Sequence, residues 1–465
     1  MKNMIHKRLG LVTSVLCTLL SVLFVSCSQE EDFAAPTDSA LRVVVGDFPA
    51  FGENGLTRAI GTQDEGKTAW ADGDKIFVHL YSQKFGDQAA TLTFDAESNT
   101  WESDDAPLNY LENETPTITA VYAPDCEIKS DETIGLLEGK RYGEEEYIPA
   151  KTSISGNTLD ISFKSGRTYS RLRIAAMPEA TLTVSTEGFT PAGATSEATE
   201  AYTLTADEKG NAYLYGTFSE DAMVSVKQGD ITLKDYTFTA EKNPNGTEHN
   251  KSYALDARPV IDGTLGGKAE AEESDIRALM DIIKNYVANG ITTLIVTGSK
   301  PAIKDMGSWT NTAIGEAIYR LSGDGRYNED NQYNGKIDLI LQDVTEIVVQ
   351  EFFDAYALNS INLPKVTTVG DEAFQGCDHL KQIMFGSVIA SIKQENGLTF
   401  VVGDKVGGCD LVLNCGQLQT EDTYKPDLGN NVWFKPSWGG DVTWKSITLT
   451  HTGENSECDE CKALQ

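Results

Sequence analysis

Two consecutive stretches decide the fold of the C-terminal half. Residues 344–365 read VTEIVVQEFFDAYALNSINLPK, and residues 366–387 read VTTVGDEAFQGCDHLKQIMFGS. Apolar residues recur between them with a period of 22 residues. The matched pairs are Val344 and Val366, Ile347 and Val369, Phe352 and Phe374, Leu358 and Leu380, Ile361 and Ile383, and Leu363 and Phe385. Each such unit forms one short strand and one turn, and it buries its apolar side chains only against its neighbours. The period therefore predicts a stack of strands.

The stack continues downstream in a less regular form. Val388, Ile389 and Ile392 begin a third unit, and Leu411 and Leu413 continue it. So few regular units predict a short solenoid.

Upstream and downstream segments are expected to cap this stack. Residues 272–289 carry apolar residues at helical spacing, and Gly290 follows them, which predicts the one clear amphipathic helix of the chain. A strand is expected at residues 291–296. The stretch 322–338 is rich in Asp, Asn and Gly, and we interpret it as an insertion loop. The helix and the Trp-bearing stretch 432–449 are the expected caps.

The repeat also has a family resemblance. Residues 366–377 resemble the BspA-like leucine-rich repeat, and residues 291–296 match the LxxLxL strand of such repeats. That subfamily occurs on bacterial surface proteins and is usually interpreted as an adhesin or interaction module. The resemblance implies a face that binds a host or bacterial surface protein or glycan.

The N-terminal half has a different pattern. Residues 41–45, 75–81, 90–94 and 117–122 are rich in β-branched and aromatic residues, and several alternate with period two. Turn residues separate them, and no helical period is present. About 215 residues of this pattern, from residue 41 to residue 255, favour two β-sandwiches.

Landmarks in this half resemble the fimbrillin family of type V pilus proteins. In chain order they are residues 57–59, 68–76, 120–124, 161–164, 171–174 and 251–255. The resemblance implies two transthyretin-like sandwiches with a seam near residues 166–170. It also implies assembly with other fimbrillin subunits by strand addition, in which backbone hydrogen bonds supply affinity.

That family also implies a processing step. Stalk subunits lose their first strand to an arginine-specific protease, and Arg58 lies between Gly55 and Gly61, in a stretch where a cut is expected. Anchor-type relatives skip the cut and stay lipidated. An arginine in such a loop also needs no function, so the alternatives stay open.

The first residues predict export. A positive start precedes an uncharged apolar run at residues 9–25. The run closes on Leu23-Phe24-Val25-Ser26-Cys27, which resembles the lipobox of bacterial lipoproteins, although that motif usually has Leu in place of Phe24. We expect cleavage before Cys27 and lipid on its thiol, with an uncleaved anchor helix as the alternative.

Short signals after this cysteine point to the cell exterior. Ser28-Gln29-Glu30-Glu31-Asp32 resembles the acidic signal that exports lipoproteins of Bacteroides-group bacteria to the surface. Asp38-Ser39-Ala40 resembles their O-glycosylation motif, with Ser39 as acceptor, and an unmodified linker is the alternative. We expect a lipid-anchored protein of the outer membrane that faces the exterior.

Composition excludes several functions. A formal net charge of −32 repels nucleic acid phosphates and anionic lipid headgroups, so no nucleic-acid partner is expected. Hydrolase, P-loop and dinucleotide motifs are missing, and the histidines are scattered singly. A calcium loop starting at Asp330 would need a glutamate where Leu341 stands. We therefore predict no enzyme activity, no cofactor and no metal.

Cysteines add little chemistry. After export the six that remain are Cys126, Cys377, Cys409, Cys415, Cys458 and Cys461. Disulfides can form outside the cytoplasm. Cys458 and Cys461 form a lone CxxC, which favours a local disulfide or two free thiols over a redox or zinc site. Cys377 falls at an apolar repeat position and is expected to be a small buried hydrophobe.

The sequence thus predicts a mainly β chain of two transthyretin-like sandwiches and a short capped leucine-rich repeat solenoid of α/β type. The expected parts are a signal peptide (1–26), an acidic tether (27–40), sandwiches (41–166 and 167–258), a repeat module (259–455) and a tail (456–465). The expected function is adhesion, or service as an anchor or accessory subunit of a type V pilus. The alternative is a standalone surface receptor for a protein or glycan.

Overall fold

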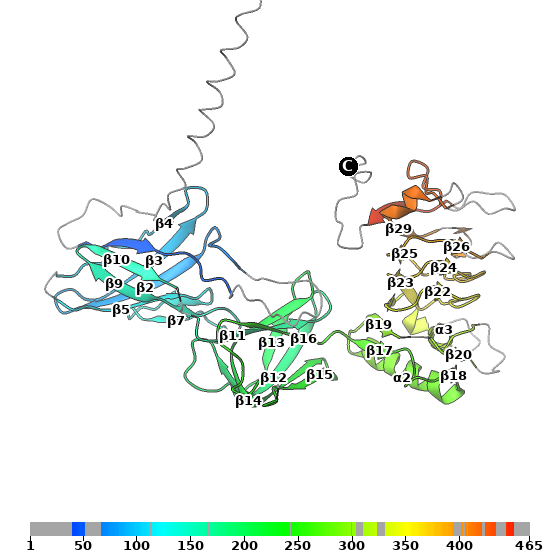
Figure 1. Cartoon of the computed structure of the whole chain (residues 1–465), viewed down its shortest axis with the longest axis horizontal. Coiled ribbons are helices and arrows are strands. Elements are labelled where there is room, and N and C mark those ends of the chain that lie inside the picture. The colour runs from blue at the N-terminus through cyan, green and yellow to red at the C-terminus, as the bar shows by residue number, and fades with distance from the viewer. Residues whose placement is uncertain are drawn as a thin grey trace, which may run out of the picture.

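The computed structural model of the chain is mainly β, as predicted (Figure 1). It describes residues 40–51, 67–111, 114–164, 167–241, 243–298, 300–303, 310–322, 331–393, 401–402, 405–406, 408–420, 424–433 and 443–450. Among these residues the strands form several sheets, and α-helix is confined to two segments. Neither of these described helices has the length and apolar character needed to cross a bilayer.

The first β module, residues 40–164, packs two sheets around one apolar core (Figure 1). An antiparallel sheet has the order β4-β3-β2-β5-β8, with β2 (Lys75–Ser82), β3 (Gly86–Asp95), β4 (Thr100–Glu102), β5 (Thr117–Tyr122) and β8 (Ile148–Pro149). The second sheet has the order β1-β10-β9, with β1 (Arg42–Val45), β9 (Lys151–Ser155) and β10 (Thr158–Ser162). A hairpin of β6 (Cys126–Ile128) and β7 (Ile134–Leu136) lies beside them. Alternating apolar residues on these strands explain why each sheet buries one face.

The second β module, residues 167–257, has its own core. Its sheet runs β13-β12-β14-β11-β16, and β15 pairs with the far half of the long β14. The strands are β11 (Ser170–Ala175), β12 (Thr181–Pro191), β13 (Tyr202–Thr205), β14 (Asn211–Gln228), β15 (Ile231–Thr237) and β16 (Ser252–Asp256). A register shift between Glu187 and Phe189 bends β12 against β14.

The C-terminal module, residues 260–450, is built on a seven-stranded parallel sheet. Its order follows the chain: β17 (Val260–Asp262), β19 (Thr293–Thr297), β21 (Ile337–Leu341), β23 (Leu358–Leu363), β25 (Gln382–Phe385), β29 (Asp410–Asn414) and β30 (Ser446–Thr450). Figure 1 shows these strands stacked side by side at the right of the view. Because every connection returns the chain to the same end of the sheet, all neighbours run parallel.

Shorter elements complete this module. A second parallel ladder joins β22 (Glu346–Ile347), β24 (Thr368–Val369) and β26 (Ser391–Ile392), and small pairs join β18 (Glu270–Ala271) to β20 (Ala302–Ile303) and β27 (Val401–Val402) to β28 (Lys405–Val406). The helices are α2 (Glu273–Ala288) and α3 (Ala313–Leu321), and the 3-10 turns are η1 (Asn331–Tyr333) and η2 (Cys415–Gln419). Helix α2 begins where the Asp275 carboxylate accepts a hydrogen bond from the Glu272 amide at 3.0 Å.

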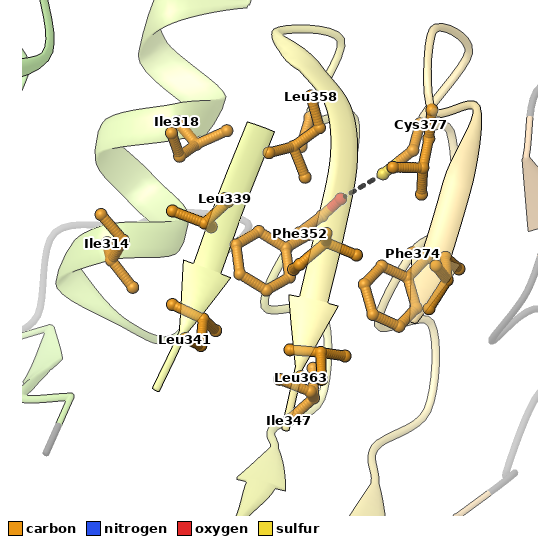
Figure 2. Close-up of a cluster of buried hydrophobic side chains, with 14 of the residues drawn as sticks. Ile314, Ile318, Leu339, Leu341, Ile347, Phe352, Leu358, Leu363, Phe374 and Cys377 are labelled. Carbon is orange, nitrogen blue, oxygen red and sulfur yellow. Dashed lines mark hydrogen bonds between the residues drawn. The ribbon is translucent and has the colours of Figure 1, made fainter. Parts of the chain in front are cut away.

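The repeat register predicted from the sequence is confirmed. Ile361 lies opposite Ile383 and Leu363 opposite Phe385, and all four side chains are buried. Figure 2 shows the matched rings of Phe352 and Phe374 side by side in this core. Their centroids are 5.9 Å apart and their planes are 9° apart. Cys377 is fully buried, as predicted, and its thiol also donates to the Phe352 carbonyl at 2.9 Å.

Two predictions for this module are wrong. Helix α3 is a second helix that the pattern did not indicate, and Ile314 and Ile318 on it face Leu339 and Leu341 of the sheet (Figure 2). The loop expected at residues 322–338 also extends too far at its C-terminal end, because β21 begins at Ile337. Ile337, Leu339 and Leu341 of β21 are buried, and this alternation anchors the strand in the sheet.

Candidate interaction surfaces

The predicted modification sites lie outside the residues that the structure describes. Cys27, the pentad Ser28-Gln29-Glu30-Glu31-Asp32, Ser39 and Arg58 all lie outside the described residues, as do Cys458 and Cys461. Cys126, Cys377, Cys409 and Cys415 are described, and no disulfide joins any two of them. The interaction surfaces below are therefore formed by other residues.

The first surface is the edge strand β1. It pairs in parallel with β10 on one side, from Arg42 opposite Thr158 to Val45 opposite Ile161. Leu41 and Val43 are buried in the core of the first module. Parallel pairing with the chain's own N-terminal strand thus completes this sheet.

The segment after β1 is held by a buried arginine. Arg167 donates to Glu146 Oε2 through Nη2 at 2.6 Å and through Nε at 3.0 Å, and their side chains are only 1% and 9% exposed. Its Nη1 donates to the Pro49 carbonyl and, at 3.2 Å, to Asn250 Oδ1. Arg167 therefore joins the N-terminal segment, the first module and the second module at one point.

Aromatic rings reinforce this junction. The Phe51 ring lies 3.7 Å from the Arg167 guanidinium carbon and 4.8 Å from that of Arg171. Phe48 packs edge-on against Trp70 and Tyr122, with centroid distances of 5.0 and 5.6 Å. We call residues 46–51, with these contacts, the N-terminal strap.

Asp74 has a larger role than the sequence indicated. Asp74 lies directly before β2, and its carboxylate accepts from Lys67 Nζ and, at 3.3 Å, from the Tyr122 hydroxyl. The Lys67 ammonium lies 5.1 Å from the Phe48 centroid and 4.8 Å from the Tyr122 centroid. This cluster closes the first module beneath the strap.

Acidic residues also gather near the junction of the two β modules. Burial and the neighbouring Asp125 carboxylate raise the pKa of Glu145 to about 7. Asp125 Oδ1 pairs with Lys140 at 3.0 Å, whereas its buried Oδ2 has no hydrogen-bond partner among the described residues. No described group of His, Cys, Asp and Glu has the arrangement of a metal site.

The second surface is the outer face of the parallel sheet. Leu294 and Val296 point into the core, so Thr293 and Ile295 lie on the opposite face of β19, where Thr293 is half-buried and Ile295 is only 3% exposed. The residues that pair in register with these two on the following strands form two rows across the sheet. The polar row is Thr293, Asp338, Ser360, Gln382, Asp410 and Ser446, and the mainly apolar row is Ile295, Ile340, Asn362, Met384, Val412 and Thr448.

Hydrogen bonds fix the polar row. Asp338 Oδ1 accepts from Ser360 Oγ at 2.5 Å and from Asn359 Nδ2 at 2.8 Å, and Asp410 Oδ1 accepts from Ser446 Oγ at 2.7 Å. Asn359 Oδ1 is buried and accepts from no described residue. The face therefore presents oriented polar groups beside an apolar row, an arrangement suited to binding.

Sequence reasoning also missed a buried ion pair in this module. Lys300 Nζ donates to Glu351 Oε2 at 2.5 Å, and Glu351 also accepts from the Val348 amide at 2.9 Å and from Thr312 Oγ1 at 3.2 Å. The pair connects the start of helix α3 to the repeat units. Its members are 51 residues apart, so no local pattern points to them.

Comparison with known proteins gives partial similarities. No family model matches the sequence, and no curated protein matches it either. A protein assigned to cell adhesion, from Bacteroides fragilis, is similar over 46% of this chain and 92% of its own, with 11% identity and a TM-score of 0.27. A fimbrial protein from Bacteroides ovatus is similar over 48% of this chain, which spans about half (49%) of its length, with 11% identity and a TM-score of 0.26.

Proposed function

We propose that this chain is a non-enzymatic surface lipoprotein that acts in adhesion, or as an anchor or accessory subunit of a type V pilus. The observation that carries the proposal is the outer face of the parallel sheet, where a fixed polar row runs beside an apolar row. Such a face offers both directional hydrogen bonds and desolvation to a partner.

The fold assignment that goes with this proposal has two parts. The two β modules would be transthyretin-like sandwiches with boundaries at residues 41–166 and 167–258. The C-terminal module would be a short leucine-rich repeat solenoid within residues 259–455. Each of the three parts has an apolar core of its own, to which a few residues of the neighbouring part contribute, and this supports the division.

Attachment to the outer membrane would come through lipid on Cys27, with the acidic pentad as the surface-export signal and Ser39 as a candidate glycosylation site. The lipid would hold the chain by one end and leave the modules in the exterior solvent. This assignment rests on the sequence.

The N-terminal strap supports an anchor or accessory role over a stalk role. A stalk subunit must release its first strand to receive one from another subunit. Here β1 is paired with β10 along its length. Arg167 holds the strap that follows β1 through the Pro49 carbonyl and the Phe51 ring. Retention of the strand is the state that these contacts stabilise.

A second candidate is a standalone receptor that binds a protein or glycan on the sheet face without assembling into a pilus. The polar row, in which hydrogen bonds orient the Asp338 and Asp410 carboxylates, favours it. Both candidates share the binding face, and they differ in whether other fimbrillin subunits are partners.

Mass spectrometry of the mature N-terminus is the first test. A lipidated start at Cys27 on monomeric protein is expected for an anchor or receptor. An unmodified start at Ala59, with strand-exchanged polymers, would overturn the retained-strand proposal. Adhesion of cells with and without the chain then tests the binding role, and equal adhesion would overturn it.

A further inference from the structure

The second β module and the C-terminal module meet through a hairpin tip. Gly229 and Asp230 join β14 to β15, and the Asp230 amide donates to Asn289 Oδ1 at 2.8 Å. Ile231 is buried within the core of the C-terminal module. Gly229 has φ +57°, and a Cβ there would lie 2.6 Å from Asn289 Oδ1, so only glycine allows this close approach.

A cleft of about 490 Å³ opens beside this contact. One wall comes from the 177–180 turn, the start of β12 and the end of β14, and the other from residues 289–293. Since the hairpin tip fixes both walls to each other, the cleft belongs to the folded state. Its volume suits a ligand of about two or three sugar rings.

The lining is polar and almost uncharged. Hydroxyls of Thr181, Thr183, Thr292 and Thr293 and amides of Gln228 and Asn289 contribute to it, and Glu179 is the only charged residue among the described residues that line it. No described lysine, arginine or histidine lines it, so a phosphate or carboxylate would find no counter-ion. The net charge of −32 also repels anions.

One lining atom lacks a partner. Gln228 Oε1 is buried and accepts no hydrogen bond from any described residue. A buried acceptor without a donor costs free energy, and this oxygen becomes available to a ligand when the Gln228 side chain turns into the cleft. Threonine hydroxyls both donate and accept, which matches a ligand whose surface is covered by hydroxyl groups.

We infer that this cleft binds a neutral saccharide. This inference rests on the proposed adhesive function and names its ligand class and place. Thr293 lines the cleft and also begins the polar row of the sheet. A longer glycan would leave the cleft along Asp338 and Ser360, the next two members of that row.

Binding of the whole mature chain to a printed array of neutral and sialylated glycans tests the inference. Neutral glycans should be retained and sialylated ones should not. Thr183→Val and Gln228→Leu should each weaken binding about tenfold, the loss of one or two hydrogen bonds. Thr203→Val is the matched control, because Thr203 lies opposite Thr183 on β13 but does not line the cleft.

Several results would overturn the inference. They are retention of no neutral glycan, equal weakening by the Thr183 and Thr203 variants, and binding of a protein ligand that survives enzymatic removal of its glycans. Adhesion of cells separates this inference from the proposed function. If the cleft variants adhere like the wild type, the saccharide site is wrong while adhesion stands. If cells without the chain adhere equally, the proposed function fails whatever the array shows.

Discussion

The guanidinium carbon of Arg167 lies 3.7 Å from the centre of the Phe51 ring, and the same guanidinium forms a buried ion pair with Glu146. One side chain thus holds the N-terminal strap and joins the two β modules. A buried charge of this kind is expensive to leave alone.

Arg167→Met should destabilise the first module. It leaves the Glu146 carboxylate buried without its cation, which lowers the free energy of unfolding by about 3–5 kcal/mol. Hydrogen exchange of the β1 amides should also become faster. Arg277→Met is the control, because its pair with Glu273 is exposed and contributes about 1 kcal/mol at most. Equal effects of the two changes would contradict the role given to Arg167.

Stability of the first module should fall as pH rises through about 7. The folded-state pKa of Glu145, raised to about 7 by burial and Asp125, lies above the ordinary value of 4.5. The protonated carboxyl is therefore favoured by folding, so this contribution is full below pH 4.5 and is lost as pH rises through about 7. Glu145→Gln should remove this dependence in thermal unfolding, whereas the exposed Glu187→Gln should leave it in place.

Thiol labelling should separate the described cysteines. Burial raises the pKa of Cys126 to about 11 and that of Cys409 to about 12, and it raises the pKa of Cys377 as well. Since the thiolate is the reactive form, none of the three should react with a disulfide reagent at pH 8 in the folded protein. In a chain with Cys458→Ser and Cys461→Ser, the half-buried Cys415 should react alone, and all four should react in guanidinium. Rapid native labelling of Cys377 would contradict the buried core.

Phe374→Ala should strongly destabilise the C-terminal module. The ring is fully buried and stacks on Phe352, so its removal costs about 3–5 kcal/mol. Phe85→Ala, at a ring that is 37% exposed, should cost far less. Urea unfolding of the two variants measures the difference, and similar midpoints would show that the repeat core is not closely packed.

Much of the fold could be predicted because it follows local periodicity. The strand expected at residues 117–122 is β5 with the same bounds, and the repeat period places Ile361 opposite Ile383. Helix α3 was missed for a physical reason. It spans only nine residues, with Glu316 and Arg320 among them, so its helical period covers too few turns to stand out in the sequence. Its Gly315, which argues against a helix, is required because a Cβ there would lie 2.1 Å from the Glu351 carbonyl oxygen.

Less of the interaction surfaces could be predicted from the sequence. Arg167 and Glu146 are 21 residues apart, and their pairing depends on how two modules meet. The saccharide cleft takes Thr183 and Thr293 from different modules, 110 positions apart in the chain. Neither threonine belongs to a motif, because the cleft exists only after the hairpin tip has docked.

That docked tip also has a mechanical meaning. The C-terminal module is tied to the rest of the molecule twice, once by the covalent link near Arg258 and once by Ile231 in its core. A body held at one point swivels, whereas a body held at two points resists torque. A force applied to the C-terminal module would therefore be transmitted to the second β module through both connections.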